Sequence, residues 1–330
     1  MAEEEEQQPS MKQVTPTSTV DIDNGLTLVP RIKLNLTVHP STPTTLTNPI
    51  DHWKMKRALI DFLNSSHSLS IPEENLQFKR FKDLKKRKRD DAVATGTLHI
   101  WDLTFLPQTE NDTSVSQWRS RFAEKVNGTE LNLQGVRFTL EVSVPVGDDF
   151  DAVKKDWEEF YAFGNRGLRR EPDTIVIKGV PSRWFAEPRV SSKPSMLVTH
   201  TIFSKFGKIR NLNVAEDDDF GKDANEDSGD LVSGLYCKIV VQFEKYIDFH
   251  DALRVLCSRS LQKQGSRLKA DYEVSWDKDG FFRYSRTQTQ EKNNGVSKIA
   301  TQQNRSEAPR RQSYNSRQSP DRVRPRRFQE

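Results

Sequence analysis

Residues Thr174–Val180 read TIVIKGV, a β-branched stretch that ends at Gly179 and Pro181 and predicts a buried strand. The chain then continues in the order helix, strand, strand, helix and strand, in the segments Met196–Phe206, Ile209–Val214, Leu231–Phe243, Tyr246–Cys257 and Leu268–Asp277. The last segment alternates strictly as LKADYEVSWD, which is typical of a strand with one buried face. This βαββαβ order predicts a ferredoxin-like module.

A fainter copy of the same order precedes this module. Its first strand is the alternating segment Arg31–Val38, and its other predicted elements are Pro49–Asn64, Leu76–Leu84, His99–Phe105, Val115–Val126 and Val136–Val144. Between the copies, Phe150–Phe163 has aromatic side chains at helical spacing, and we expect this helix to pack between the two units. The predicted fold class is therefore α+β, with two ferredoxin-like modules joined by a helix.

The composition indicates that part of the chain does not fold. Of the 330 residues only 34% are hydrophobic and 30% are charged, which leaves too little apolar area to order every segment. We expect a disordered acidic tail at residues 1–26 and a divergent first module at 27–147. A linker helix at 148–171 leads to a clearer second module at 172–280, and a disordered arginine-rich tail follows at 281–330. The apolar runs are too short to span a bilayer and the N-terminus is acidic, so we expect a soluble protein without a membrane partner.

Charge is separated into blocks along the chain. Residues 79–89 read KRFKDLKKRKR, Ala215–Asp230 contains eight acidic residues, and Thr301–Glu330 contains eight arginines. This separation favours a chain that meets a polyanion with one surface and avoids it with another. The basic run is a candidate nuclear import signal and a candidate contact for RNA phosphates, and a solvated charged face is the third interpretation; the run consists of Lys85, Lys86, Arg87, Lys88 and Arg89. Both functional interpretations predict a nuclear protein.

Enzymatic motifs are not found in the sequence. It contains no P-loop, nucleophile elbow or dinucleotide-binding glycine pattern, and its six histidines lack the spacing of metal ligands. Two cysteines, Cys237 and Cys257, are too few for a disulfide framework or a thiolate zinc site. We therefore expect no catalytic residue, no metal and no cofactor.

The βαββαβ order also suggests an RNA recognition motif, in which aromatic rings on the two central strands stack on bases. When the motif of the third strand is aligned on Phe243, Lys238 and Val240 occupy the two stacking positions. On the first strand, Val176 stands where an aromatic residue commonly lies, with Lys178 beside it. Each lost stack removes about 1–3 kcal/mol, so the sequence predicts weak RNA binding dominated by phosphates. The candidate RNA-binding residues are Lys85, Lys86, Arg87, Lys88, Arg89, Lys178, Tyr236 and Lys238; a packing scaffold or protein-binding surface is the alternative.

Three stretches resemble the A-kinase anchor protein 17A family: PDTIVIKGVPSRWFA at 172–186, IFSKFGKIRNLNV at 202–214 and WEEFYAFG at 157–164. The distinctive part is the Trp184–Phe185 pair. The resemblance implies RNA-recognition-motif proteins associated with alternative splicing in the nucleus. It also makes Trp184 and Phe185 candidates for binding other proteins.

These observations together predict a nuclear, non-enzymatic accessory factor in pre-mRNA splicing, with RNA and splicing proteins as partners. One alternative is a protein–protein scaffold that does not bind RNA. A protein kinase A anchoring adaptor is the other alternative, but we do not carry kinase anchoring over from the family. The chain ends in a short arginine-rich tail at Glu330, and its only spare amphipathic helix, Phe150–Phe163, is aromatic and is expected to be buried.

Overall fold

A computed structural model describes residues 14–41, 51–80, 92–106, 112–133, 135–163, 171–217 and 234–282. Residues 1–279 form one compact unit and residues 280–330 another, and the fold described below belongs to the first. Among the described residues, none of the helices combines the length and apolar character that a membrane span requires.

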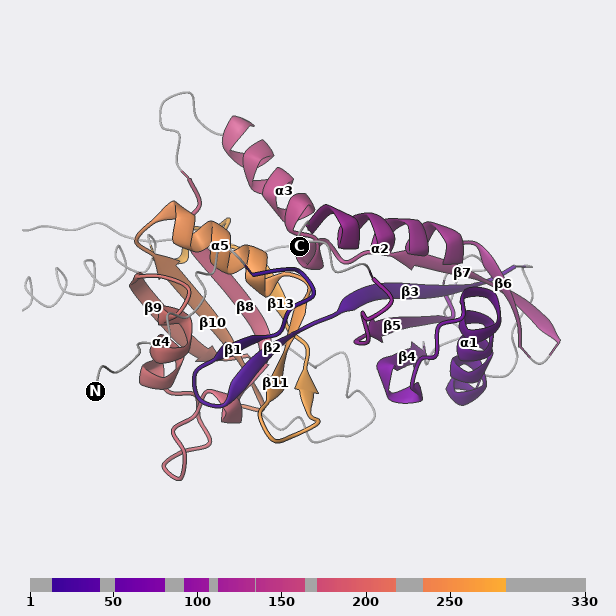
Figure 1. Ribbon diagram of the computed structural model, residues 1–330, viewed down its shortest axis with the longest axis horizontal. Coiled ribbons are helices and arrows are strands. Elements are labelled where there is room, and N and C mark those ends of the chain that lie inside the picture. The colour runs from indigo at the N-terminus through magenta and orange to yellow at the C-terminus, as the bar shows by residue number, and fades with distance from the viewer. Residues whose placement is uncertain are drawn as a thin grey trace, which may run out of the picture. The chain divides into compact units, whose positions relative to one another are not determined.

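The second module has the predicted ferredoxin-like fold (Figure 1). Its elements are β8 (Thr174–Pro181), α4 (Met196–Ser204), β9 (Ile209–Glu216), β10 (Tyr236–Phe243), α5 (Tyr246–Leu256) and β13 (Glu273–Trp276). The strands form an antiparallel sheet in the order β13-β8-β10-β9. Alternate strand residues such as Ile177 and Val241 share one core with Phe203 of α4 and Phe249 of α5. Both helices therefore cover the same face of the sheet, and the face that points away from them is called the open face below.

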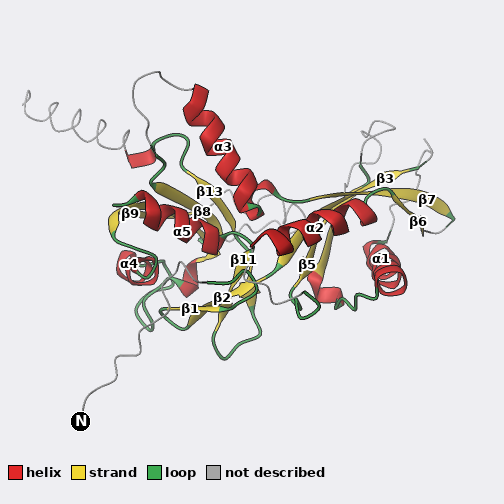
Figure 2. Cartoon of the chain, turned by 45° about the horizontal axis from the view of Figure 1, so that its top comes forward, coloured by secondary structure: helices red, strands yellow, loops and turns green. Residues whose placement is uncertain are grey.

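The first module repeats this arrangement with one additional strand. Its elements are β3 (Ile32–Pro40), α1 (His52–His67), β4 (Leu76–Arg80), β5 (Ala94–Ile100), α2 (Asp112–Val126), β6 (Thr129–Leu133) and β7 (Val136–Ser143). The sheet order is β4-β5-β3-β7-β6, so β6 extends the sheet beyond β7. Leu59 of α1 and Phe122 of α2 pack on the strand residues of one core, which places both helices on one face. Figure 2 shows these two helices beside the sheet.

The third strand of this module differs from its predicted range. It spans Ala94–Ile100 and not His99–Phe105, because Gly96 interrupts the apolar alternation by which strands are recognised in sequence. The glycine is required by a close approach: a Cβ atom at Gly96 would lie 2.6 Å from the carbonyl oxygen of Gln77 and 2.7 Å from Cδ1 of Phe78.

A third sheet joins the N-terminal segment to the second module. It has the order β1-β2-β11-β12, formed by β1 (Val20–Ile22), β2 (Leu26–Pro30), β11 (Arg259–Lys263) and β12 (Lys269–Ala270). Strand β1 lies within residues 1–26, which the sequence analysis assigned to a disordered tail. Asn24 and Gly25, in the three-residue connection between the paired residues Ile22 and Leu26, both have positive φ, 62° and 65°, a conformation that Asn and Gly adopt more readily than other residues. The predicted strand Leu268–Asp277 is correspondingly divided into β12 and β13. The domain boundaries themselves stay a prediction.

Helix α3 (Phe150–Phe163) has its predicted range but packs differently from the expectation. Its buried residues Val153 and Trp157 belong to the core of the second module, where the rings of Trp157 and Phe249 are 5.5 Å apart. Trp276 of β13 donates a hydrogen bond from Nε1 to Asp156 of α3, at 2.8 Å. Most of the helix therefore packs on the second module, while its first residues, Phe150 and Asp151, line a pocket together with Val115 and Ser116 of the first module.

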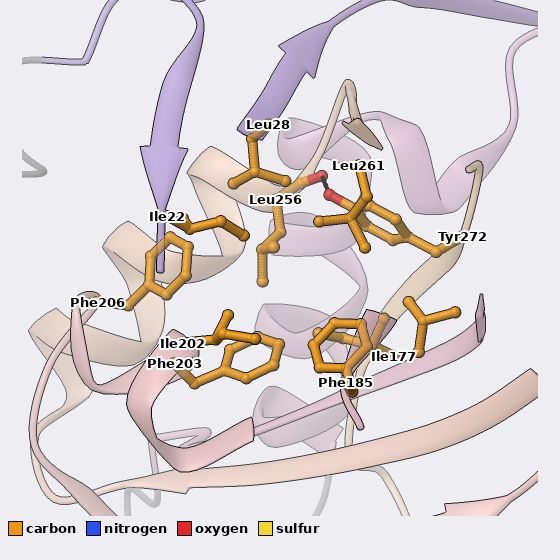
Figure 3. Close-up of a pocket in the computed structure, with 11 residues that line it drawn as sticks. Ile22, Leu28, Ile177, Phe185, Ile202, Phe203, Phe206, Leu256, Leu261 and Tyr272 are labelled. Carbon is orange, nitrogen blue, oxygen red and sulfur yellow. Dashed lines mark hydrogen bonds between the residues drawn. The ribbon is translucent and has the colours of Figure 1, made fainter. Parts of the chain in front are cut away.

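The core of the second module continues onto the N-terminal hairpin. Figure 3 shows the small apolar cavity where the two meet, with Ile22 and Leu28 on one side and Phe185 and Phe203 on the other. The hydroxyl of Tyr272 closes this region by donating to the carbonyl oxygen of Leu256, at 2.8 Å. The cavity measures only about 10 Å³, so the contact between hairpin and module is closely packed.

Both cysteines are buried, which makes their thiols weak acids. Burial raises the pKa of Cys237 to about 12 and raises that of Cys257 as well. Because the thiolate is the reactive form, we expect neither native thiol to react appreciably with an aromatic disulfide reagent near pH 8. Both should react once the chain is unfolded in guanidinium chloride. A rapid reaction of the native protein would contradict this expectation.

Candidate nucleic-acid interface

The open face of the second module has valines at two positions where an RNA recognition motif commonly has aromatic rings. Val176 and Val240 are paired across β8 and β10 and are only 8% and 1% exposed. Within the described strands of this sheet, the one aromatic ring at an open-face position is that of Tyr236, at the end of β10 beside Pro181. A base therefore lacks a central ring on which to stack.

Lys178 and Lys238 lie on neighbouring strands of this face, toward the same end of the sheet, so the structure brings these two predicted residues together. Carboxylates surround them. Glu273 is paired with Lys178 across β13 and β8, and Asp217 accepts a hydrogen bond from the amide of Gly179 at 3.3 Å. This end of the face therefore combines both signs of charge, which limits its attraction for phosphates.

The open face of the first module is polar. The side chains at its open positions are those of Lys33, Asn35, Thr37 and His39 on β3, Gln77 and Lys79 on β4, Thr95, Thr97 and His99 on β5, Arg137, Thr139, Glu141 and Ser143 on β7, and Glu130 and Asn132 on β6. None of these open positions in the described strands is occupied by Phe, Tyr or Trp. Hydroxyl and amide groups can hydrogen-bond RNA, but they provide no stacking surface.

The basic run belongs to the connection between β4 and β5. Arg80 is paired with Ala94, and the amide of Val93 donates to the carbonyl oxygen of Val38 at 2.7 Å. Lys85–Arg89 themselves lie outside the described residues. The connection starts and ends beside the last residues of β3, at one end of the open face of the first module.

A second basic segment lies at the opposite end of this face. The hairpin between β11 and β12 reads KQGSRLK from Lys263 to Lys269, and its three cations Lys263, Arg267 and Lys269 are exposed. The ammonium of Lys269 is 4.2 Å from the ring centroid of Trp101, which follows β5 of the first module. Sequence reasoning missed this hairpin because it assigned no strand to β11 and placed Leu268 and Lys269 in one long strand, Leu268–Asp277. The Gly-Ser pair between flanking cations was the available signal.

A buried ion cluster joins the two modules beside the hairpin. The Arg31 guanidinium, 1% exposed, forms ion pairs with Asp148, which ends the 3₁₀ turn Val146–Asp148, and with Asp271, which follows β12. Asp271 also pairs with two side chains of the first module, Lys33 at 2.6 Å and His99 at 3.3 Å. One carboxylate of the second module therefore lies at the end of the open face of the first.

A glycine places Asp148 in this cluster. A Cβ atom at Gly147 would lie 2.8 Å from the carbonyl oxygen of Val274 on β13, closer than a side chain tolerates. The 3₁₀ turn thus packs against the backbone of the second module only with glycine at this position.

Residues 110–317, well over half of the chain, match the family model described as "AKAP-17A-like, RNA-binding domain". The chain belongs to this family. Over 186 residues it is 28% identical to human (Homo sapiens) A-kinase anchor protein 17A, a match that covers 53% of this chain and 26% of that protein. The chain thus spans about a quarter of the relative's length.

Among solved structures, the comparison structure is a Cas6 substrate mimic complex. The two are 8% identical, and the superposition covers 75% of this chain and 99% of that one with a TM-score of 0.27. Similarity at this level carries no conclusion about fold or function.

Trp184 and Phe185, the pair that is distinctive in the resemblance to the A-kinase anchor protein 17A family, lie in different environments in the structure. Phe185 is 1% exposed and its ring is 6.4 Å from that of Phe203 in the core. Trp184 ends a 3₁₀ turn, Ser182–Trp184, and is partly exposed, while its carbonyl oxygen accepts a hydrogen bond from Asn24 of the N-terminal hairpin. Contact with a protein partner therefore stays a prediction for Trp184, and the structure assigns Phe185 to packing.

Because of the ion cluster, we expect the free energy of unfolding of this family member to depend on pH in the acidic range. Burial alone would raise the pKa of Asp271, but the hydrogen bond with His99 and the charges of Arg31 and Lys33 outweigh it and hold that pKa well below its usual range. A lowered folded-state pKa stabilises the fold above the unfolded value of about 3.9, and the contribution is lost as pH falls further.

We therefore expect the difference in free energy of unfolding between the wild type and Asp271→Asn to be constant above about pH 5 and to shrink below about pH 4. Urea unfolding at a series of pH values measures this difference. A difference that does not change between pH 5 and pH 3 would contradict the role of the Asp271 charge.

Proposed function

We propose that the chain is an RNA-associated accessory factor in pre-mRNA splicing that acts in the nucleus and without catalysis. The observation that carries the RNA part is its membership in the AKAP-17A-like RNA-binding family over residues 110–317. Splicing proteins are the protein partners that we propose, with the partly exposed Trp184 as one candidate contact.

The geometry supports a binding mode dominated by phosphates. Three aromatic stacks on an open sheet would together contribute several kcal/mol, at about 1–3 kcal/mol each, and Val176 and Val240 stand at two of those positions. Five consecutive cations in the β4–β5 connection, Lys85–Arg89, offer instead a contact that releases counterions and does not depend on sequence. The first module contributes polar groups alongside.

A protein–protein scaffold without RNA binding is the second candidate. The carboxylates of Glu273 and Asp217 around Lys178 favour it, because they lower the attraction of the second module for RNA. We do not propose kinase anchoring. The buried face of α3, with Val153 and Trp157, packs in the core of the second module and is not available to a partner.

Crosslinking in cells with recovery of both RNA and proteins tests the proposed function. Recovery of intron-containing transcripts together with splicing proteins is the expected result. Recovery of splicing proteins without crosslinked RNA would favour the scaffold, and recovery of neither would contradict both.

Nuclear import through the basic run is a separate expectation. Replacing Lys85–Arg89 with alanine should move a fluorescently tagged full-length chain from the nucleus to the cytoplasm, because the run is the densest cluster of cations in the sequence. The control is Lys154→Ala with Lys155→Ala on α3, which also removes cations. Unchanged nuclear localisation of the five-residue variant would remove this role.

A further inference from the structure

Trp101 is an aromatic ring at the junction of the two modules, just beyond the last residue of β5. Its ring is stacked on that of His99, with centroids 5.6 Å apart and planes inclined by 15°. His99 is itself paired with Asp271, from Nε2 to Oδ2 at 3.3 Å. The orientation of the Trp101 ring is therefore set in advance by its neighbours, as a stacking platform requires.

The Trp101 ring also carries a cation. Lys269 Nζ lies 4.2 Å from its centroid, and the pKa of this lysine is lowered by partial burial, while the charge of Glu74 acts in the opposite direction. A partly exposed cation–π contact is weaker than the stack of a base on an indole ring. An RNA base can therefore displace the ammonium from the ring, and the freed ammonium is then close to the phosphates of the same strand.

The hairpin that supplies Lys269 is suited to hold those phosphates. Lys263 and Arg267 are exposed on the same short hairpin, which contains no acidic residue from 263 to 269. The hairpin lies opposite the β4–β5 connection, at the other end of the open face of the first module. A single strand that runs from the basic run across this face arrives at Trp101.

We propose that Trp101 stacks on one base of bound RNA, while Lys263, Arg267 and Lys269 hold the adjoining phosphates. This inference rests on the proposed function and names a contact site for it. The site accepts any base, because every base has a face to stack. The hairpin of the second module thereby completes a surface that begins on the first module.

The experiment measures the affinity of the full-length chain for single-stranded oligouridine RNA at several salt concentrations. Trp101→Ala is expected to weaken binding by about 10-fold, with the same loss at each salt concentration, because stacking releases no counterions. Trp101→Phe keeps a ring and should restore most of the affinity. Lys263→Ala with Arg267→Ala should instead flatten the dependence of log K on log salt by about 1.4.

Trp53→Ala is the matched control. Trp53 is 50% exposed on α1, on the helical face of the first module, and its loss should leave RNA affinity unchanged. An equal loss for the Trp53 and Trp101 variants would overturn the inference. So would wild-type affinity in Trp101→Ala, and if alanine substitution of Lys85–Arg89 still weakens RNA binding, the proposed function would then stand. A wild-type chain that binds no RNA at low salt would overturn both.

Ultraviolet crosslinking of the wild-type chain to the same RNA, followed by peptide mapping, gives a readout that does not depend on how a variant folds. A crosslinked peptide that contains Trp101 supports the site. Crosslinks that map only to other peptides would overturn it.

Discussion

Replacing Arg31 with alanine is expected to lower the free energy of unfolding by about 3–5 kcal/mol, the usual effect of breaking a buried ion pair by removing one partner. The Arg31 guanidinium is fully buried, and two carboxylates, those of Asp148 and Asp271, depend on it. Its own pKa reflects this: desolvation alone would lower it, but the two carboxylates raise it above the ordinary value. Without Arg31, the buried Asp148 side chain loses its charge partner.

Urea unfolding of the full-length chain measures this loss, and Arg137→Ala is its control. Arg137 also pairs with a carboxylate, that of Glu130 at 3.8 Å, but its side chain is 71% exposed. Exposed pairs contribute about 0–1 kcal/mol, so the control should unfold almost as the wild type does. A loss below about 1 kcal/mol for Arg31→Ala would show that the cluster is solvated and does not hold the modules together.

Replacing Lys85–Arg89 with alanine is expected to give the largest change in RNA affinity. If all five cations contact phosphates of a single strand, the slope of log K against log salt should flatten by about 3.5. At about 0.2 M salt this corresponds to a loss on the order of 100-fold, and the loss should grow as salt is lowered. Filter binding or fluorescence anisotropy with a labelled single strand measures both quantities.

The control for this variant removes cations from the opposite side of the same module. Lys54, Lys56 and Arg57 lie on α1, which covers the core face of the sheet, and their replacement with alanine should leave the salt slope unchanged. If the Lys85–Arg89 variant keeps the wild-type slope, the run does not contact RNA. Its remaining interpretations are then nuclear import and a solvated charged face.

Most of the fold could be predicted from alternation along the chain. Strand β3 was predicted from its four alternating apolar residues, and α3 from its aromatic spacing, because both signals arise from a single buried face. Periodicity does not reveal which strands pair. Strand β2 pairs with β11, more than 200 residues away, and this is why the first strand and the turn of the N-terminal hairpin were assigned to a tail although Asn24–Gly25 marked the turn.

The candidate site was less predictable than the fold. The positions of Val176 and Val240 on the open face could be predicted, because alignment with the RNA recognition motif gives the position of each residue along its own strand. Arg31 could not, because an arginine in a sequence reads as a surface residue, and its burial depends on carboxylates from two distant segments. Trp101 was assigned to the predicted strand His99–Phe105. Its contact with Lys269 could not be predicted, because Lys269 comes from the other module.

The most direct test is an equilibrium titration of the full-length chain with four single-stranded RNA homopolymers, one for each base, over a range of salt concentrations. A chain that holds RNA mainly by its phosphates should bind all four with similar affinity, and log K should fall linearly with log salt. Tight binding of one homopolymer that persists at high salt would contradict this, and so would the absence of binding to any of them at low salt.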